Sequence, residues 1–135
     1  MATLLLKTEP SEYSYDDLER DRRTAWSGVR NAQALQVMRA ARRGDEAFIY
    51  HTGDEKRIVG LARVVSDARP DRTSDDDRVV CFDIAPLNRA RSPVSLAQIK
   101  ADKRFASFLL IRNSRLSVME VPRPLDRLLR QMAGL

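Results

Sequence analysis

Short apolar runs separated by polar segments predict a protein with several β-strands. The apolar run from Leu4 to Leu6 predicts a buried first strand, which Pro10 interrupts because proline cannot donate a backbone hydrogen bond. Val79 to Ile84 predicts a long strand that ends near Pro86. The other apolar or alternating runs predict strands over residues 47–51, 58–65 and 117–121.

Capping signals predict the helices. Ser14 with Asp17, and Ser95 with Gln98, have the spacing of a capping box, in which two side chains and two backbone N–H groups hydrogen-bond reciprocally. Apolar residues at helical spacing support two longer helices, and residues 105–111 are ambiguous between helix and strand. The predicted helices run from Ser14 through Glu19, from Asn31 through Arg43 with Gly44 after it, from Leu96 onward, and from Pro124 to Gly134.

The order of these elements predicts an α+β fold. Hairpins outnumber strand–helix–strand units, so we expect a mixed or antiparallel sheet and not a doubly wound parallel one. A small sheet with short edges is best protected when it curls into a barrel. The 135 residues carry no repeat and no linker, so we expect a single domain over residues 1–135.

Composition excludes several kinds of site. The chain has one cysteine, Cys81, and one histidine, His51, which excludes a disulfide framework, a cysteine-based zinc site and the common multi-histidine metal sites. The contiguous acids Asp75 to Asp77 lack the spacing of a calcium loop, so we interpret them as a solvated loop tip. No glycine-rich phosphate loop and no nucleophile elbow is present. We therefore predict no metal, no cofactor and no catalytic residue.

The charge of the chain allows a polyanionic partner. Lysine and arginine total 24 against 19 acidic residues, which gives a net charge of +5. Such a basic surface attracts nucleic acid, although the same charge also serves ordinary solubility. No apolar run is long enough to cross a membrane, and the N-terminus does not resemble a signal peptide, so we expect a cytosolic protein without a membrane partner.

The segment from Trp26 to Asn31 has the strongest chemical character. A tryptophan ring offers a stacking face, Gly28 allows close backbone approach, and Asn31 has both donor and acceptor groups for the edge of a base. These residue types suit a flat heterocyclic ligand. The alternative interpretation is a core tryptophan, a turn glycine and a helix-capping asparagine.

Three further segments carry candidate chemistry. In the strand ending at His51, alternation places Tyr50 with Phe48 on one face and His51 with Ile49 on the other. Lys7 and Glu9 follow the first strand and fit an acid–base pair, an ion pair or solvated charges. Arg112 and Arg115 fit a phosphate clamp or a polar loop.

Taken together, these segments resemble the EVE domain family. The resemblance follows chain order and covers nearly the whole sequence. It rests on Leu5–Ser14, on Trp26-Ser27-Gly28-Val29-Arg30-Asn31, on Phe48–His51, on Ile58–Ala62 and on Arg112–Val118. The resemblance implies a PUA-like fold, a curled mixed sheet with flanking helices, which is similar to that of the YTH and ASCH domains.

The resemblance also implies a function and a site. The resemblance implies a non-enzymatic reader of modified bases, chiefly modified cytosine in DNA. RNA is the alternative partner. The implied ligand-binding and nucleic-acid-binding residues are Lys7, Glu9, Trp26, Ser27, Val29, Arg30, Asn31, Tyr50 and His51, with Arg115 and Ser117 at the border of the pocket.

The sequence departs from the family pattern at three places. Ala32 and the start of the strand near Val79 stand where an aromatic residue is frequent, and Thr52 stands where a serine is frequent. A missing aromatic wall would widen the pocket or leave it one stacking surface.

Two rival functions stay open. One is a hydrolase of modified nucleosides, as in ASCH-type relatives, although Lys7, Thr8 and Glu9 are adjacent and cannot all converge from one extended segment. The other is a small-molecule sensor.

Overall fold

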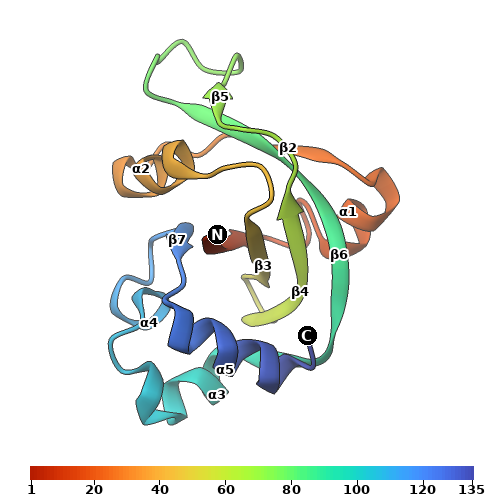
Figure 1. Ribbon diagram of the computed structural model, residues 1–135, viewed down its shortest axis with the longest axis vertical. Coiled ribbons are helices and arrows are strands. Elements are labelled where there is room, and N and C mark those ends of the chain that lie inside the picture. The colour runs from red at the N-terminus through yellow and green to blue at the C-terminus, as the bar shows by residue number, and fades with distance from the viewer.

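The computed structural model describes residues 1–135 and contains one strongly curved sheet surrounded by helices (Figure 1). The strands follow the order β2-β6-β4-β3-β1-β7 across the sheet, and β5 pairs with β6. Their bounds are β1 Thr3–Thr8, β2 Thr24–Trp26, β3 Glu46–His51, β4 Arg57–Val64, β5 Arg69–Pro70, β6 Val80–Ser95 and β7 Val118–Glu120.

The sheet is mixed, as predicted. Strand β1 pairs with β3 in parallel, from Thr3 opposite Glu46 to Thr8 opposite His51, and the other pairings are antiparallel. Strand β3 lies inside the sheet, and its residues from Ala47 to His51 are buried. The expectation of an α+β fold with a curled mixed sheet is therefore confirmed.

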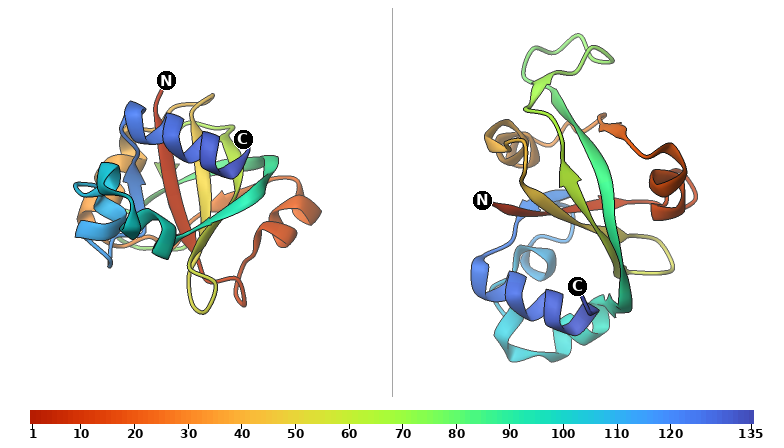
Figure 2. Two further views of the ribbon diagram at one scale, coloured as in Figure 1. Left: turned by 90° about the horizontal axis from the view of Figure 1, so that it is seen from below. Right: turned by 45° about the vertical axis from the view of Figure 1, so that its right-hand side comes forward.

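Strand β6 is longer than the sequence predicts. It runs for 16 residues, along almost the whole height of the molecule, and passes both Pro86 and Pro93 (Figures 1 and 2). Prolines are tolerated at bulges and where a strand lacks a partner on one side. Pro86 lies opposite Ala62 beside a register shift, and Pro93 lies in a stretch that bulges between two paired positions of β4. The prediction that this strand ends near Pro86 was wrong for that reason.

The helices lie outside the curved sheet. The longest, α5 (Arg123–Ala133), lies at one end of the molecule beside α3 (Leu96–Ala101) (Figure 1). The others are α1 (Tyr15–Asp21), α2 (Ala32–Ala40) and α4 (Leu109–Arg112), with a 3₁₀ turn at Lys103–Phe105. The capping boxes predicted at Ser14 and Ser95 are both present, and the ambiguous residues 105–111 form short helical turns.

Helix α2 ends at Ala40, three residues before the predicted end at Arg43. The buried carboxylate of Asp45 accepts a hydrogen bond from the backbone N–H of Arg42 at 2.9 Å, which removes this donor from the helix. Ala41 is extended and buried beneath this turn. The predicted helix end was wrong because the Asp45 side chain, which lies outside the helix, accepts the backbone hydrogen bond that a further helical turn would need.

One hydrophobic core lies between the curved sheet and the helices that cover it. Phe48, Phe82, Phe105 and Phe108 are completely or almost completely buried in it. Gly60 on β4 lets the side chain of Tyr15 pack directly against the strand. A Cβ atom at this position would lie 2.6 Å from the Tyr15 ring. The close packing of β4 and α1 therefore requires a glycine at this position.

The capping box at the start of α3 provides a stability test. The Ser95 hydroxyl accepts a hydrogen bond from the N–H of Gln98 at 3.1 Å, and the Gln98 side chain accepts one from the N–H of Ser95 at 2.8 Å. We expect Ser95→Ala to lower the free energy of unfolding by about 1 kcal/mol, the usual cost of losing such a cap. Urea denaturation measures this change. Ser92→Ala, at an exposed position in β6, is the control and should change stability by less than about 0.5 kcal/mol.

Candidate nucleobase pocket

A cavity of about 450 Å³ opens where β1 ends beside β2. This volume lies within the range of roughly 300–1,000 Å³ that is typical of ligand pockets. We call it the Trp26 cavity. It is lined by Lys7, Thr8, Glu9, Glu12, Tyr13, Thr24, Ala25, Trp26, Ser27, Gly28, Val29, Arg30 and Ser117.

Two aromatic rings form a corner in the wall of this cavity. Trp26 is the last residue of β2, where it pairs with the buried Phe82 of β6, and its own ring is half-buried. The ring of Tyr13 meets it edge to face, with centroids 6.4 Å apart and planes at 80°. The Tyr13 hydroxyl donates to Asp21 at 2.9 Å, which fixes this ring. A rigid aromatic corner of this kind suits a flat heterocycle.

The loop after Trp26 is held by a buried carboxylate. Gly28 has φ +76°, a left-handed conformation that favours glycine, and its N–H donates to Asp71 at 2.9 Å. Asp71 is only 3% exposed and also accepts hydrogen bonds from the N–H and hydroxyl of Thr73. The Gly28 N–H bond, followed by those of Thr73, lowers the pKa of the Asp71 carboxyl. An ionised Asp71 therefore anchors one wall of the cavity to the 70–79 loop.

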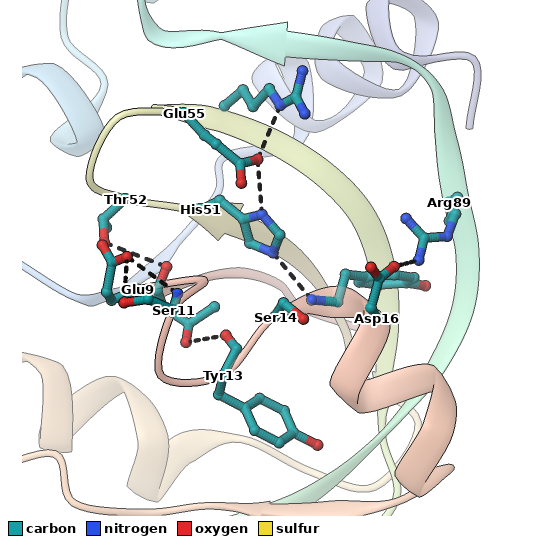
Figure 3. Close-up of polar contacts among 12 residues, drawn as sticks. Glu9, Ser11, Tyr13, Ser14, Asp16, His51, Thr52, Glu55 and Arg89 are labelled. Carbon is teal, nitrogen blue, oxygen red and sulfur yellow. Dashed lines mark hydrogen bonds and ion pairs between the residues drawn. The ribbon is translucent and has the colours of Figure 1, made fainter.

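Lys7 and Glu9 do not pair with each other. The Lys7 ammonium donates to the carbonyl of Ser114 at 3.0 Å, and burial lowers its pKa. The Glu9 carboxylate accepts hydrogen bonds from the N–H and hydroxyl of Ser11 and from Thr52 (Figure 3). The bonds from Ser11 lower the pKa of Glu9. The two opposite charges at the rim of the cavity are thus held by separate partners.

His51 is buried at the end of β3 and links two elements. Its Nε2 accepts a hydrogen bond from the backbone N–H of Tyr15 at 3.0 Å, and its Nδ1 lies 3.0 Å from Glu55 (Figure 3). The acceptor role of Nε2 places the ring proton on Nδ1, which donates to the carboxylate. Since Tyr15 is the first residue of α1, His51 satisfies a free N–H group at that helix start.

The sequence-predicted site residues fall into two groups. Seven of them line the Trp26 cavity, and four do not. The seven are Lys7, Glu9, Trp26, Ser27, Val29, Arg30 and Ser117. Asn31 caps α2 through the N–H of Ala34, Tyr50 lines a neighbouring cavity, His51 is buried in the network above, and Arg115 is exposed without an ion pair. Contact of any of the eleven with a ligand stays a prediction.

Sequence reasoning missed two important contributors. Tyr13 belongs to the Leu5–Ser14 segment that carries the family resemblance. No local pattern indicates that its ring meets that of Trp26, 13 residues further along the chain. Asp71 lies just before the acidic run from Asp75 to Asp77 that we interpreted as a solvated loop tip, yet it is buried. An Asp two residues before a Thr is a turn signal, but only the fold brings it against Gly28.

The remaining chemistry of the chain is limited. The structure brings together no group of three or more histidine, cysteine, aspartate or glutamate side chains that would hold a metal ion. None of its helices has the length and apolar character needed to span a membrane. The Trp26 cavity therefore offers stacking surfaces, backbone groups and a few charges to a ligand.

Solved structures with the same architecture include a Rhodopseudomonas palustris protein determined by NMR, which is 41% identical with a TM-score of 0.93 over 99% of this chain and 94% of that one. Human THYN1, solved in complex with DNA that contains 5-methylcytosine, is 24% identical with a TM-score of 0.92 over 100% of this chain and 99% of that one. The ASCH protein of Zymomonas mobilis is 12% identical with a TM-score of 0.63, over 96% of this chain and 94% of that one, so only the fold is shared. The predicted PUA-like architecture is thereby confirmed.

Curated relatives of this chain include thymocyte nuclear proteins. Thymocyte nuclear protein 1 of Gallus gallus is 33% identical over 127 residues, which cover 84% of this chain and 52% of the relative. The Mus musculus protein of that name is 41% identical over 117 residues, 75% of this chain and 51% of the relative. The chain thus spans about half the length of these relatives. The family model of the EVE domain matches residues 2–132, and the chain belongs to the EVE domain family.

Proposed function

We propose that this chain is a non-enzymatic reader that takes a modified nucleobase, most simply a modified cytosine, into the Trp26 cavity. The observation that carries this proposal is the aromatic corner of Trp26 and Tyr13 beside an open, backbone-lined wall at Gly28. A Cβ atom at Gly28 would meet nothing within 4 Å, so open space lies beside this residue of the cavity lining. A flat ring stacked on Trp26 would lie against this wall.

The free energies involved allow an extruded base to enter the cavity. Extruding a base from a duplex costs a few kcal/mol, and stacking on an aromatic side chain returns about 1–3 kcal/mol per base. Hydrogen bonds to the exposed edges of the base supply further affinity and distinguish one base from another. The solved complex of human THYN1 with DNA containing 5-methylcytosine supports the ligand class, since that protein has the same fold.

Titration of short oligonucleotides tests the proposal. We expect tighter binding to strands that contain 5-methylcytosine or 5-hydroxymethylcytosine than to the matched cytosine strand, with affinity that falls as salt rises, because backbone phosphates are bound electrostatically. Fluorescence anisotropy at two salt concentrations measures both effects. Equal binding to all strands, or no binding, contradicts the proposal. The same titration with RNA decides between the two polymers.

Arg30 provides a test of backbone contact. It lies on the rim of the Trp26 cavity, is exposed and forms no ion pair within the protein. We expect Arg30→Ala to weaken binding of modified and unmodified strands alike and to reduce the slope of log affinity against log salt by about one. Arg127→Ala is the matched control, because Arg127 is exposed and lines a separate cavity with Thr3, at the other end of β1. An unchanged slope in Arg30→Ala excludes phosphate contact at this position.

A hydrolase is the alternative function, favoured by one observation. Lys7, Thr8 and Glu9 all line the cavity, because β1 ends at Thr8 and the chain then turns. Their polar atoms are nevertheless engaged separately, and the Thr8 hydroxyl donates to the carbonyl of Tyr13 at 2.7 Å. This arrangement supports binding over catalysis. Incubation with acylated nucleosides decides the matter, since release of the deacylated nucleoside would establish the hydrolase.

The cellular location expected from the sequence also stays a proposal. We expect the chain in the cytosol, whereas the curated vertebrate relatives carry the word nuclear in their name. A fluorescent fusion to the chain, viewed in its own cells, tests the expectation.

A further inference from the structure

A second cavity of about 270 Å³ adjoins the Trp26 cavity, and Lys7 lines both. We call it the Tyr50 cavity. It lies between the β3–β4 turn and the segment that carries α4. Its lining residues are Lys7, Tyr50, Thr52, Gly53, Lys56, Leu96, Leu110 and Ser114.

The Tyr50 side chain is the unusual feature of this cavity. Tyr50 is only 3% exposed, yet its hydroxyl has no hydrogen-bond partner within the protein. No fully enclosed side-chain polar atom in the protein lacks a partner, so this hydroxyl must reach the cavity space. A phenol buried to this degree normally finds a partner for its O–H group. The Tyr50 hydroxyl is therefore a donor left available for a ligand.

Positive charge surrounds this donor. The Lys7 ammonium lies 5.8 Å from the centre of the Tyr50 ring, and its one hydrogen bond in the protein goes to the Ser114 carbonyl. Lys56 lines the same cavity and forms no ion pair. Two lysines and the Tyr50 phenol thus line one small space that has no carboxylate in its lining.

Three acids lie near this cavity, and none of them is part of its lining. Glu55 contacts His51 and Arg57, whereas Glu9 keeps its charge beside Gly53, because its hydrogen-bond partners Ser11 and Thr52 are neutral. Asp54 lines an adjoining surface hollow, which shares Lys56 and Leu96 with the Tyr50 cavity. The lining itself carries two lysines and no carboxylate, so the cavity favours an anion.

We propose that the Tyr50 cavity binds a phosphate group of the strand whose base occupies the Trp26 cavity, with Tyr50, Lys7 and Lys56 as its ligands. Phosphate oxygens accept several charge-assisted hydrogen bonds at once, which suits two ammonium groups and a phenol. Because Lys7 lines both cavities, it joins the base site to the phosphate site. The sugar of the nucleotide would then lie near Lys7.

This inference rests on the proposed function, and small ligands separate the two. Isothermal titration would compare 5-methyl-2′-deoxycytidine, its 3′- and 5′-monophosphates, and inorganic phosphate. We expect one of the two monophosphates to bind at least about tenfold more tightly than the nucleoside, the gain that a charge-assisted contact provides. Tyr50→Phe and Lys56→Gln should each remove most of that gain. Tyr50→Phe deletes an unpartnered hydroxyl, so the fold should tolerate it.

Lys103→Gln is the charge-matched control, since Lys103 is exposed and lines neither cavity. It should retain the full gain from the phosphate. If the nucleoside binds and neither monophosphate binds more tightly, the inference is overturned while the reader proposal stands. A gain that survives in both Tyr50→Phe and Lys56→Gln also overturns it, because the phosphate then lies elsewhere.

If neither the nucleoside nor its monophosphates bind, the oligonucleotide titration still tests the reader proposal, and NMR shifts near Tyr50 with inorganic phosphate still test the cavity. Shifts that disappear in Tyr50→Phe and Lys56→Gln would assign the cavity to a free anion and overturn the link to a strand. The absence of any shift would overturn the anion site as well.

Discussion

We expect Trp26→Ala to lower the affinity for a strand containing 5-methylcytosine by about five- to a hundredfold, because aromatic–base stacking contributes about 1–3 kcal/mol per base. The fold should survive. Trp26 is half-buried at the end of the three-residue strand β2, which pairs only with β6. The main hydrophobic core lies on other residues, such as the fully buried Phe48 and Phe82.

Trp26→Phe is the matched control for this prediction. A smaller ring keeps a stacking face, so this variant should bind more tightly than Trp26→Ala. Circular dichroism and thermal unfolding must accompany the binding titration, because they separate loss of the pocket from loss of the fold. An unfolded Trp26→Ala protein would establish the tryptophan as a core residue, and unchanged affinity in a folded one would place the ligand elsewhere.

The sequence predicted the periodic parts of the fold well, and it failed where tertiary partners override local signals. Hydrophobic patterns and capping boxes located β1, β3, β4 and the starts of α1 and α3 within one or two residues. The long strand β6 was missed beyond Pro86 because its bulges against β4 exist only in the folded sheet. Strand β2 was missed because three residues carry no detectable period.

The candidate site shows the same division. Residues adjacent in sequence, such as those from Trp26 to Arg30, could be grouped from their chemistry, and they do line one cavity. Tyr13 and Asp71 reach the site only through the packing of α1 and the 70–79 loop. The structural interpretation of the Trp26 segment holds in part, since Gly28 has a positive φ and Asn31 caps a helix, and the ligand-binding interpretation stays a prediction.

Asp71→Asn should have the largest effect among single changes outside the hydrophobic core. The Asp71 carboxylate accepts hydrogen bonds from the N–H of Gly28, the N–H of Thr73 and the Thr73 hydroxyl. An amide has one acceptor oxygen, so its NH₂ group would face a backbone donor. We expect a loss of about 1–3 kcal/mol in the free energy of unfolding, the cost of leaving a buried polar group unsatisfied. The released Gly28 loop should also weaken ligand binding.

The pH dependence of this loss identifies its cause. The pKa of Asp71 lies below its ordinary value of 3.8, so the carboxylate stabilises the folded protein fully above that pH and loses this effect as the pH falls through its folded pKa. The stability difference between the wild type and Asp71→Asn should therefore be constant near neutral pH and shrink in acid. Asp75→Asn, in the same loop but exposed, should show neither effect. A difference that persists unchanged into acid would mean that packing at residue 71, and not its charge, holds the Gly28 loop beside Trp26.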